Sequence, residues 1–337
     1  MNRYIARRLG LMVVAVVGVT LISFLISHAV PNDPIVANLG QQASQRPEIV
    51  KAFREKWGLD RPLHIQYLAF LGNLARGELG VSLNTRRAIT KDLTQFLPAT
   101  IELSTTAVLF ALAVGVPLGV FAAVWRNSVV DHLARLVSLV GVSLPIFWLA
   151  TVSLVLFYAT LHWTVGPGRL GPQIDAPVRL TGFYTIDAAV AGDWSTFRSA
   201  ASHLVLPGLV LASSIMGLVT RVTRSSMLDA LSQDYLRTAR AKGLPEARIV
   251  GGHALRNALI PTVTVLGLAY GGLLSGAVMT ETIFAWPGLG RYAFQSAITN
   301  DFPAIMGVTF VIGAMYTLVN LVVDLLYGWL DPQIRYS

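Results

Sequence analysis

The residues that could do chemistry in this sequence have spacings that support few reactions. The run Gly166-x-Gly168-x-x-Gly171 has the letters of a dinucleotide-binding turn. Pro167 and Pro172 leave no helix N-terminus that could hold a phosphate, so we interpret this run as an ordinary turn. The sequence contains no Gly-x-x-x-x-Gly-Lys-Ser/Thr run and no His-Glu-x-x-His pair. We therefore expect no phosphate-binding loop, no metal site and no cofactor held by this chain.

Ionisable residues next to or within the apolar stretches are the other candidates, because removing a charge from water is costly and such residues often have functions. They are Glu102, His162, Glu281 and Asp324. We expect Glu102 and Glu281 at the outer ends of their helices, and Asp324 near an inner end beside Asn320. Glu102, Asn320 and Asp324 are candidate residues of a translocation pathway. The alternative is that they only face water at the helix ends.

Six apolar runs are long enough to position these residues within a membrane. Most have about 20 or more residues without a formal charge, which is enough for a helix to cross a bilayer. Inside lipid such runs must be helices, because every backbone polar group needs an internal partner. The hydrophobic share of 54% and the charged share of 13% agree with this class. The runs are 9–29, 103–125, 136–163, 204–220, 258–280 and 302–323.

The predicted fold is an all-α membrane protein with six transmembrane helices and a long external segment between helices 1 and 2. Arg3, Arg7 and Arg8 precede the first run, which predicts a cytoplasmic N-terminus. A cleaved signal peptide is the alternative, but the run exceeds the roughly 7–15 residues of a signal core. The parts are 1–29 with the first helix, 30–97 outside, and 98–337 as a five-helix core. Both termini are expected in the cytoplasm.

Small residues and proline inside the runs predict how the helices pack. Gly115-x-x-x-Gly119 and Gly267-x-x-x-Gly271 are faces that allow close helix contact. Packing within the chain and pairing with a second chain are both open uses of these faces. Pro117 and Pro145 lie in the middle of the second and third runs, and each predicts a bend in its helix.

One basic segment, residues 221–257, lies between the fourth and fifth runs. Leu236, Ala239 and Gly243 fall on one side of a predicted helix, and Arg237 and Arg240 share another. The small side would let the surface of another protein approach closely.

The same segment contains strong helix-ending and helix-starting signals. Gly243 is expected to end the first helix, and Pro245 with Glu246 to begin a second one that ends at about Asn257. Two short helices joined by a sharp turn are therefore predicted.

Residues 235–243, Tyr-Leu-Arg-Thr-Ala-Arg-Ala-Lys-Gly, and 253–259, His-Ala-Leu-Arg-Asn-Ala-Leu, resemble a known loop. It is the cytoplasmic loop by which permease subunits of ATP-binding cassette importers hold their ATPase partners, in its dipeptide, oligopeptide and nickel variant. Residues 57–62 and 280–291 resemble the same branch. The resemblance implies that ATPase coupling uses Arg237, Thr238, Ala239, Arg240, Gly243, His253, Leu255 and Arg256.

The resemblance implies a type I importer permease in the inner membrane that is not itself an enzyme. Its partners would be a second homologous permease, two cytoplasmic ATPases that carry ATP and Mg, an external substrate-binding protein and membrane lipid. Peptides are the expected cargo, with nickel or glutathione as alternatives. The formal net charge is +8, and the basic residues lie next to the membrane runs. Nucleic acid is therefore not an expected partner.

Two other classes of membrane protein would show different sequence patterns. An ion-coupled carrier would place charges in the middle of its spans and break helices in matching halves. An intramembrane enzyme would need a nucleophile paired with a base. The spans are almost free of charge, and no such pair occurs at recognisable spacing.

Overall fold

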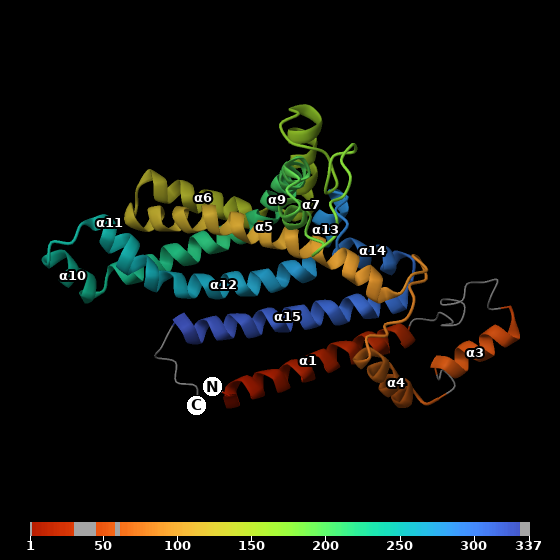
Figure 1. Ribbon diagram of the computed structural model, residues 1–337. Coiled ribbons are helices and arrows are strands. Elements are labelled where there is room, and N and C mark those ends of the chain that lie inside the picture. Colours follow the sequence, from red (N-terminus) through yellow and green to blue (C-terminus); the bar gives the residue numbers. More distant parts are fainter. Residues whose placement is uncertain (1, 30–44, 58–60, 331–337) are drawn as a thin grey trace. The chain divides into compact units, whose positions relative to one another are not determined.

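The computed structural model describes residues 2–29, 45–57 and 61–330 (Figure 1). Within these ranges the regular elements are helices, apart from one isolated bridge between Val81 and Ala88. The predicted all-α class is therefore confirmed. Residues 30–44 and 58–60 of the expected external segment, and the C-terminal residues 331–337, lie outside the described residues.

The chain divides into two compact units, and the first comprises residues 1–100 and 287–317. Its elements are α1 (Asn2–Ala29), α3 (Pro47–Trp57), α4 (Leu63–Ala75), α14 (Leu289–Ile298), and the first parts of α5 (Ile89–Val124) and α15 (Phe302–Leu330).

The core of this first unit joins α5, α14 and α15. Ile89 and Leu93 pack with Tyr292 and Val308. Buried Asp301 stands before the first turn of α15, where it accepts hydrogen bonds from the Ala304 amide and from the Ser82 hydroxyl at 2.6 Å. This aspartate therefore fixes the start of a helix and a distant loop at once.

The second unit comprises residues 101–286 and 318–337. Besides the later parts of α5 and α15, its elements are α6 (Val129–Ser143), α7 (Ile146–Ser153), the π-helix η1 (Leu154–Thr160), α8 (Tyr184–Val190), α9 (Trp194–Leu231), α10 (Asp234–Ala241), α11 (Glu246–Arg248), the π-helix η2 (Ile249–Ala254), α12 (Leu255–Gly276) and α13 (Val278–Ile283).

Helix α9 is the centre of the second unit and packs against both α6 and α12. Glycines allow the close approach that lipid-embedded helices need. A Cβ on Gly119 of α5 would lie 2.7 Å from the carbonyl oxygen of Thr220 in α9. Gly115 meets Val219 and Met216 of the same helix. The Gly115–Gly119 face is thus used for packing within this chain.

By length and composition, four helical stretches among the described residues could cross a membrane. They are Ile89–Val124, Trp194–Leu231, Glu246–Leu274 and Phe302–Val323. The bent pair Val129–Ser143 and Ile146–Thr160 adds a fifth if it forms one broken span, and α1 carries a shorter apolar stretch, Gly10–Ile26. The count of six spans stays a prediction.

The third apolar run, 136–163, is not one continuous helix. It consists of α6 and then α7 with η1, which meet at an angle of 102°. Pro145 causes the break, because proline cannot donate a backbone hydrogen bond and keeps its predecessor out of the helical region. Leu144 accordingly has an extended ψ of 130°. The predicted bend at Pro145 is confirmed, and it is sharp enough to end a helix. At Pro117, by contrast, α5 continues as one helix.

The second helix of the basic segment does not end near Asn257, so that boundary was wrong. The chain stays helical from Glu246 through η2 and α12 to Gly276. Pro261 lies inside α12. A proline there removes only one backbone donor, whereas ending the helix at the membrane edge would leave several groups without partners.

Candidate functional site

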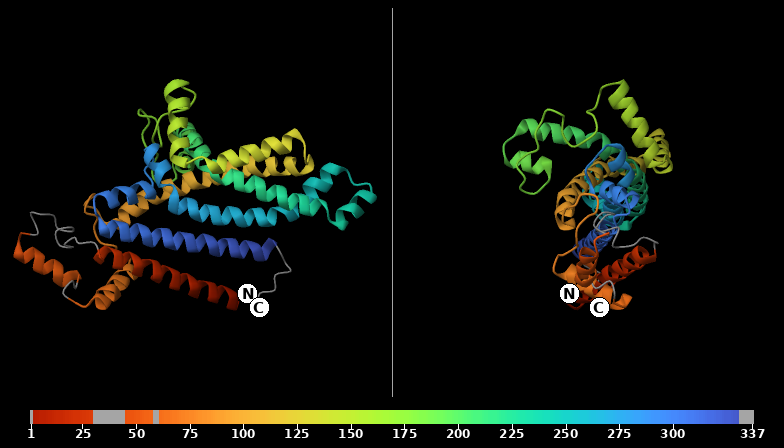
Figure 2. Two further views of the ribbon diagram at one scale, coloured as in Figure 1. Left: turned by 180° about the vertical axis from the view of Figure 1, so that it is seen from behind. Right: turned by 90° about the vertical axis from the view of Figure 1, so that its right-hand side faces the viewer.

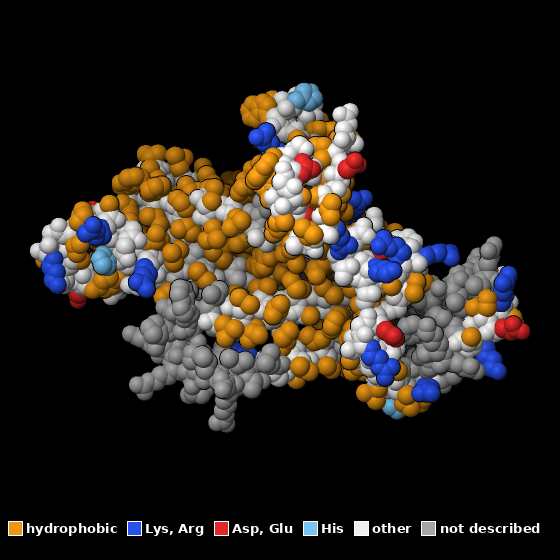
Figure 3. All heavy atoms as spheres, viewed as in Figure 1, with side chains coloured by type: hydrophobic (Ala, Val, Ile, Leu, Met, Phe, Trp, Pro, Cys, Tyr) orange, Lys and Arg blue, Asp and Glu red, His pale blue; other side chains and the backbone are white. Residues whose placement is uncertain are grey.

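Helices α10 and α11 project from the ends of α9 and α12, and form the candidate docking segment (Figures 1 and 2). Lys and Arg side chains gather over this end, while hydrophobic side chains cover much of the adjoining helices (Figure 3). We define the docking segment as residues 234–257, which contains all eight predicted coupling residues.

The end of α10 is set by Gly243, as the sequence predicted. Gly243 has a φ of +75°, a conformation that glycine adopts without strain. Its amide donates to the Arg240 carbonyl at 2.9 Å, and the Leu244 amide donates to the Ala239 carbonyl at 3.3 Å. These two bonds form a Schellman motif, which satisfies carbonyl groups left open at the helix end. Leu244 then packs against the core beneath α10.

A small hydrophobic core holds the docking segment to the rest of the second unit. Leu236 of α10 is fully buried, as are Met227 of α9 and Ile249 of η2. Ala123 from the end of α5 and Ala258 from α12 complete the contact between elements. The segment is therefore seated on the ends of three long helices.

Ala239 belongs to this core, and its role in ATPase coupling stays a prediction. The residue is only 9% exposed and faces the chain's own buried cluster. The helical spacing correctly placed Leu236, Ala239 and Gly243 on one side, but that side packs inward at the first two. Leu255 is half-buried against the same cluster.

Two polar contacts brace the turn between α10 and the second helix. Arg240 donates to Glu246 through Nη2 at 2.8 Å and through Nε at 3.0 Å. The amide of Asn257 donates to the Tyr235 hydroxyl at 2.8 Å. Sequence reasoning missed Glu246, Tyr235 and Asn257 as members of the site. For Glu246, the available signal was its negative charge six residues after the positive charge of Arg240.

The exposed surface of the docking segment is basic and contains small residues. Of the predicted coupling residues, the exposed ones are Arg237, Thr238, Arg240, Gly243, His253 and Arg256. Gly251 and Gly252 in η2 are exposed too, and a Cβ on Gly243 or Gly251 would meet no atom within 4 Å. A surface of this kind leaves room for the side chains of another protein and can bind carboxylates through its arginines.

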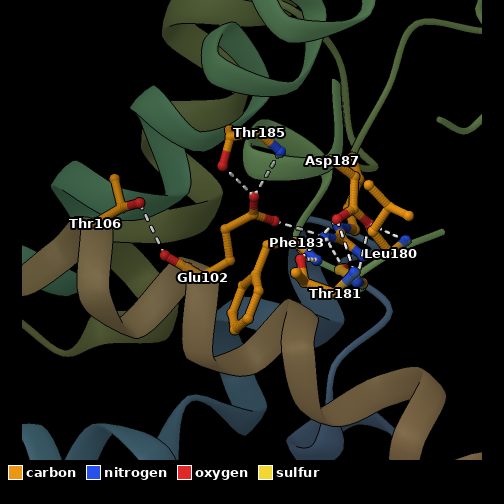
Figure 4. Close-up of polar contacts among 9 residues, drawn as sticks. Glu102, Thr106, Leu180, Thr181, Phe183, Thr185 and Asp187 are labelled. Carbon is orange, nitrogen blue, oxygen red and sulfur yellow. Dashed lines mark hydrogen bonds and ion pairs between the residues drawn. The ribbon is translucent and has the colours of Figure 1, made fainter. Parts of the chain in front are cut away.

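Glu102, the first candidate pathway residue, lies in a buried polar network (Figure 4). It is 6% exposed and forms an ion pair with Arg169, which is equally enclosed. The amide and hydroxyl of Thr185 donate to the other carboxylate oxygen at 2.9 and 2.6 Å. The guanidinium of Arg169 stacks over the Tyr184 ring, 3.5 Å from its centre. Both oxygens of Glu102 are thus occupied by partners within the chain.

Arg169 is the ion-pair partner of Glu102 in this network, and sequence reasoning missed it. It lies inside the glycine run 166–171, which the structure shows as bends without a following helix. Gly168 has a φ of +104°, and its amide donates to the Phe284 carbonyl at 2.9 Å. The glycines therefore shape a turn that delivers Arg169 to Glu102, which confirms the reading of this run as a turn.

Asp187 organises the loop next to this network (Figure 4). Its carboxylate accepts hydrogen bonds from the Thr181 amide and hydroxyl, and from the Gly182 amide at 2.9 Å. Burial alone would raise the pKa of Asp187, but these donors stabilise the charged form and lower it overall. Arg169 also donates to the Gly182 carbonyl at 3.0 Å, so the two carboxylates hold one loop.

Asn320 and Asp324 are the other candidate pathway residues. Asn320 is half-buried on α15, and the side chain of Asp324 lies outside the described residues. Glu281 is fully buried in α13. Among the described residues, no group of three or more His, Asp or Glu side chains could hold a metal ion.

The second unit thus combines long apolar helices with a compact basic segment at their ends. Residues 115–336 match the family of binding-protein-dependent transport system inner membrane components, and residues 1–104 match the N-terminal model of such membrane components. The chain belongs to this family. It is a multi-pass inner-membrane permease subunit of an ATP-binding cassette importer, as the resemblance predicted.

Similar proteins cover essentially the whole chain. The probable D,D-dipeptide transport system permease protein DdpB of Escherichia coli K12 is 50% identical over 323 residues, which cover 96% of this chain and 94% of DdpB. The di/tripeptide transport system permease protein DppB of Pseudomonas aeruginosa UCBPP-PA14 is 44% identical over the full length of both chains. The dipeptide transport system permease protein DppB of Escherichia coli K12 is 42% identical, also over both full lengths.

Proposed function

We propose that this chain imports peptides across the inner membrane by forming half of a translocation pathway with a second homologous permease. Dipeptides and short oligopeptides are the proposed cargo, because the relatives at 42–50% identity carry names of dipeptide or di/tripeptide permeases. An external binding protein delivers the peptide. Two separate cytoplasmic ATPases, which carry ATP and Mg, supply the energy, and this chain has no ATP site of its own.

The observation that carries the proposal is the seating of the docking segment. Its exposed face offers Arg237, Gly243 and Arg256 to a partner, while its inner face is fixed by Leu236 to a core shared with α9 and α12. An ATPase bound to the exposed face would therefore move the ends of these long helices with it. Closure of the ATPase pair would thus switch the spans between two arrangements as rigid bodies.

Reconstitution tests this function. The chain, its partner permease and both ATPases are placed in proteoliposomes, and uptake of a labelled dipeptide is followed with the binding protein present. We expect uptake that needs ATP and the binding protein. An isolated chain should hydrolyse no ATP. Uptake that continues without ATP and stops with a proton uncoupler would instead identify an ion-coupled carrier.

The same vesicles decide between cargoes. Labelled nickel and glutathione are offered in place of the dipeptide, each with the same binding protein. If peptides are the cargo, unlabelled dipeptide should reduce uptake of the labelled dipeptide, whereas unlabelled nickel or glutathione should not.

A further inference from the structure

A pocket between α6 and α9 has no part in the proposed coupling, and its lining combines charged and apolar side chains. Its volume is about 470 Å³. One wall comes from α6 and includes Arg135, Leu139 and Val142, and the other comes from α9 and includes Arg221 and Arg224. The spacing within each set is helical, so each set is one face of its helix.

The two helices run antiparallel, and two contacts bound the pocket along them. At one end α6 and α9 touch closely, because Gly141 and Gly217 bring their backbones together at Ser213 and Ser138. Toward the other end, buried Asp131 accepts two hydrogen bonds from Arg224, at 2.7 and 2.8 Å. The pocket therefore lies between a close backbone contact and an ion pair of the two helices.

The charge around Asp131 is not balanced among the described residues. Asp131 is the acidic partner of both Arg224 and Arg135, the latter at 3.3 Å. Arg221 is exposed and makes no hydrogen bond or ion pair with any of the described residues. Three guanidinium groups thus line a space beside one buried carboxylate, which leaves an excess of positive charge and unused N–H donors.

Away from Asp131, the pocket is lined by apolar side chains of α6 that are exposed. Leu139 is 66% exposed and Val142 is 49% exposed, and both lie further along α6 than Arg135. Because α9 continues from Arg224 into the docking segment, the arginine end is the end nearer the proposed cytoplasmic surface. The pocket is therefore cationic at the membrane surface and apolar toward the membrane interior.

We infer that this pocket binds one anionic phospholipid of the inner leaflet. The phosphate group contacts Arg221 and the free donors of Arg224 and Arg135, and an acyl chain lies along Leu139 and Val142. Basic pockets between membrane helices bind acidic headgroups in this way. A soluble anion would not use the apolar end, and a neutral lipid would leave the excess charge without a partner. The choice of leaflet rests on the proposed cytoplasmic location of the docking segment.

The test measures lipid retained by the full-length chain purified with its partner subunits. After delipidation, phosphatidylglycerol or phosphatidylcholine with identical acyl chains is added, and bound lipid is counted by native mass spectrometry. We expect phosphatidylglycerol to be retained preferentially. Arg221→Gln should weaken its binding about fivefold, the loss expected for one arginine at a membrane surface. Arg221→Lys should retain most of it.

Arg126→Gln is the matched control, because Arg126 is exposed before α6 but does not line the pocket. Equal effects of Arg126→Gln and Arg221→Gln would overturn the proposal, since they would indicate nonspecific charge. Equal retention of the two lipids would also overturn it. Displacement by soluble glycerol phosphate at the same concentration would show that the acyl chain is not bound, and would likewise contradict a lipid site.

A further experiment asks whether protein occupies the pocket instead. Leu139→Cys is labelled in intact membranes with a lipid-soluble maleimide and with a bifunctional cross-linker. Labelling with no cross-link to the second permease is expected. Efficient cross-linking to that permease would show that the groove is a subunit interface. Because lipid retention does not require ATPase binding or uptake, its outcome is independent of the test of peptide import.

Discussion

Gly243 has a positive φ at the point where α10 turns toward α11, and no neighbouring atom lies where its Cβ would be. Glycine is therefore favoured here by the backbone conformation and by the proposed contact of the ATPase on the exposed face. A residue with a Cβ costs roughly 1–2 kcal/mol in this conformation, and Asn and Asp tolerate it best.

Replacing Gly243 separates the two contributions. Gly243→Asn and Gly243→Asp have the same shape and a similar backbone cost, but only Asp adds a negative charge to the basic docking face. We expect Gly243→Asp to lose ATPase co-purification and peptide uptake, and Gly243→Asn to keep more of both. Arg237→Ala, at a side chain that is 79% exposed, should weaken coupling far less. Normal transport by Gly243→Asp would refute the docking role.

Glu102 and Arg169 form an ion pair whose two side chains are almost completely enclosed. Removing one charge leaves the other buried without a partner, which typically costs about 3–5 kcal/mol. We expect Glu102→Gln to lower the midpoint of thermal unfolding clearly and to reduce uptake in parallel with the loss of folded protein.

Thr106→Val is the control for that experiment, because the Thr106 hydroxyl bonds only to the backbone carbonyl of Glu102. Its replacement should cost about 1 kcal/mol or less. If Glu102→Gln leaves stability unchanged but alters the affinity for peptide, then Glu102 acts in the pathway and not in the fold.

At the scale of elements, the first turn of α9 depends on an exposed capping residue. Asp193 accepts hydrogen bonds from the Thr196 hydroxyl at 2.6 Å and from the Thr196 amide at 3.1 Å. These donors, the hydroxyl first, lower the pKa of Asp193 to about 2. The folded pKa is below the unfolded value of about 3.9, so the cap is fully effective above about pH 4. Its contribution is lost as the pH falls toward 2.

Hydrogen exchange of the amides at the start of α9, corrected for the intrinsic pH dependence, checks this prediction. Protection should fall between about pH 4 and pH 2 in the native chain. Asp193→Ser keeps a capping hydroxyl without a titrating group, so its protection should not change over this interval. A pH-dependent loss of the same size in Asp193→Ser would assign the effect to another group.

The inner and outer residues of the docking segment have different roles. Its inner residues, such as Leu236 and Ala239, hold it to the ends of the long helices, and its arginines remain outside. The π-helix η2 continues it into α12 without a break in the backbone. Such π segments are often found at functional sites. Movement of the segment therefore reaches a membrane helix directly.

At the scale of the whole molecule, the orientation in the membrane is the main prediction. Tags after Ser337 and within residues 225–250 should be labelled only from the cytoplasm. A tag near Gln42, which lies outside the described residues, should be labelled only from outside. The reason is the position of Arg3, Arg7 and Arg8 before the first apolar run. Cytoplasmic labelling at Gln42 would invert the proposed topology.

Local rules were enough to predict much of the fold. The length of an apolar run predicts a helix because lipid offers no partner to the backbone, so the class did not depend on tertiary contacts. The end of α10 at Gly243 and the break at Pro145 also followed from the chemistry of single residues. The family was also predicted from local sequence, because residues 235–243 and 253–259 are two short continuous runs that lie close together.

Tertiary structure decided what faces what. Helical spacing put Ala239 on the small side of α10, but only packing against α9 and α12 determined that this side points inward. The partner of Glu102 is 67 residues away, in a loop shaped by Gly168. The arginine pocket needs one face of α6 beside one face of α9. Each of these contacts depends on distant segments meeting, and no local pattern of residues encodes that meeting.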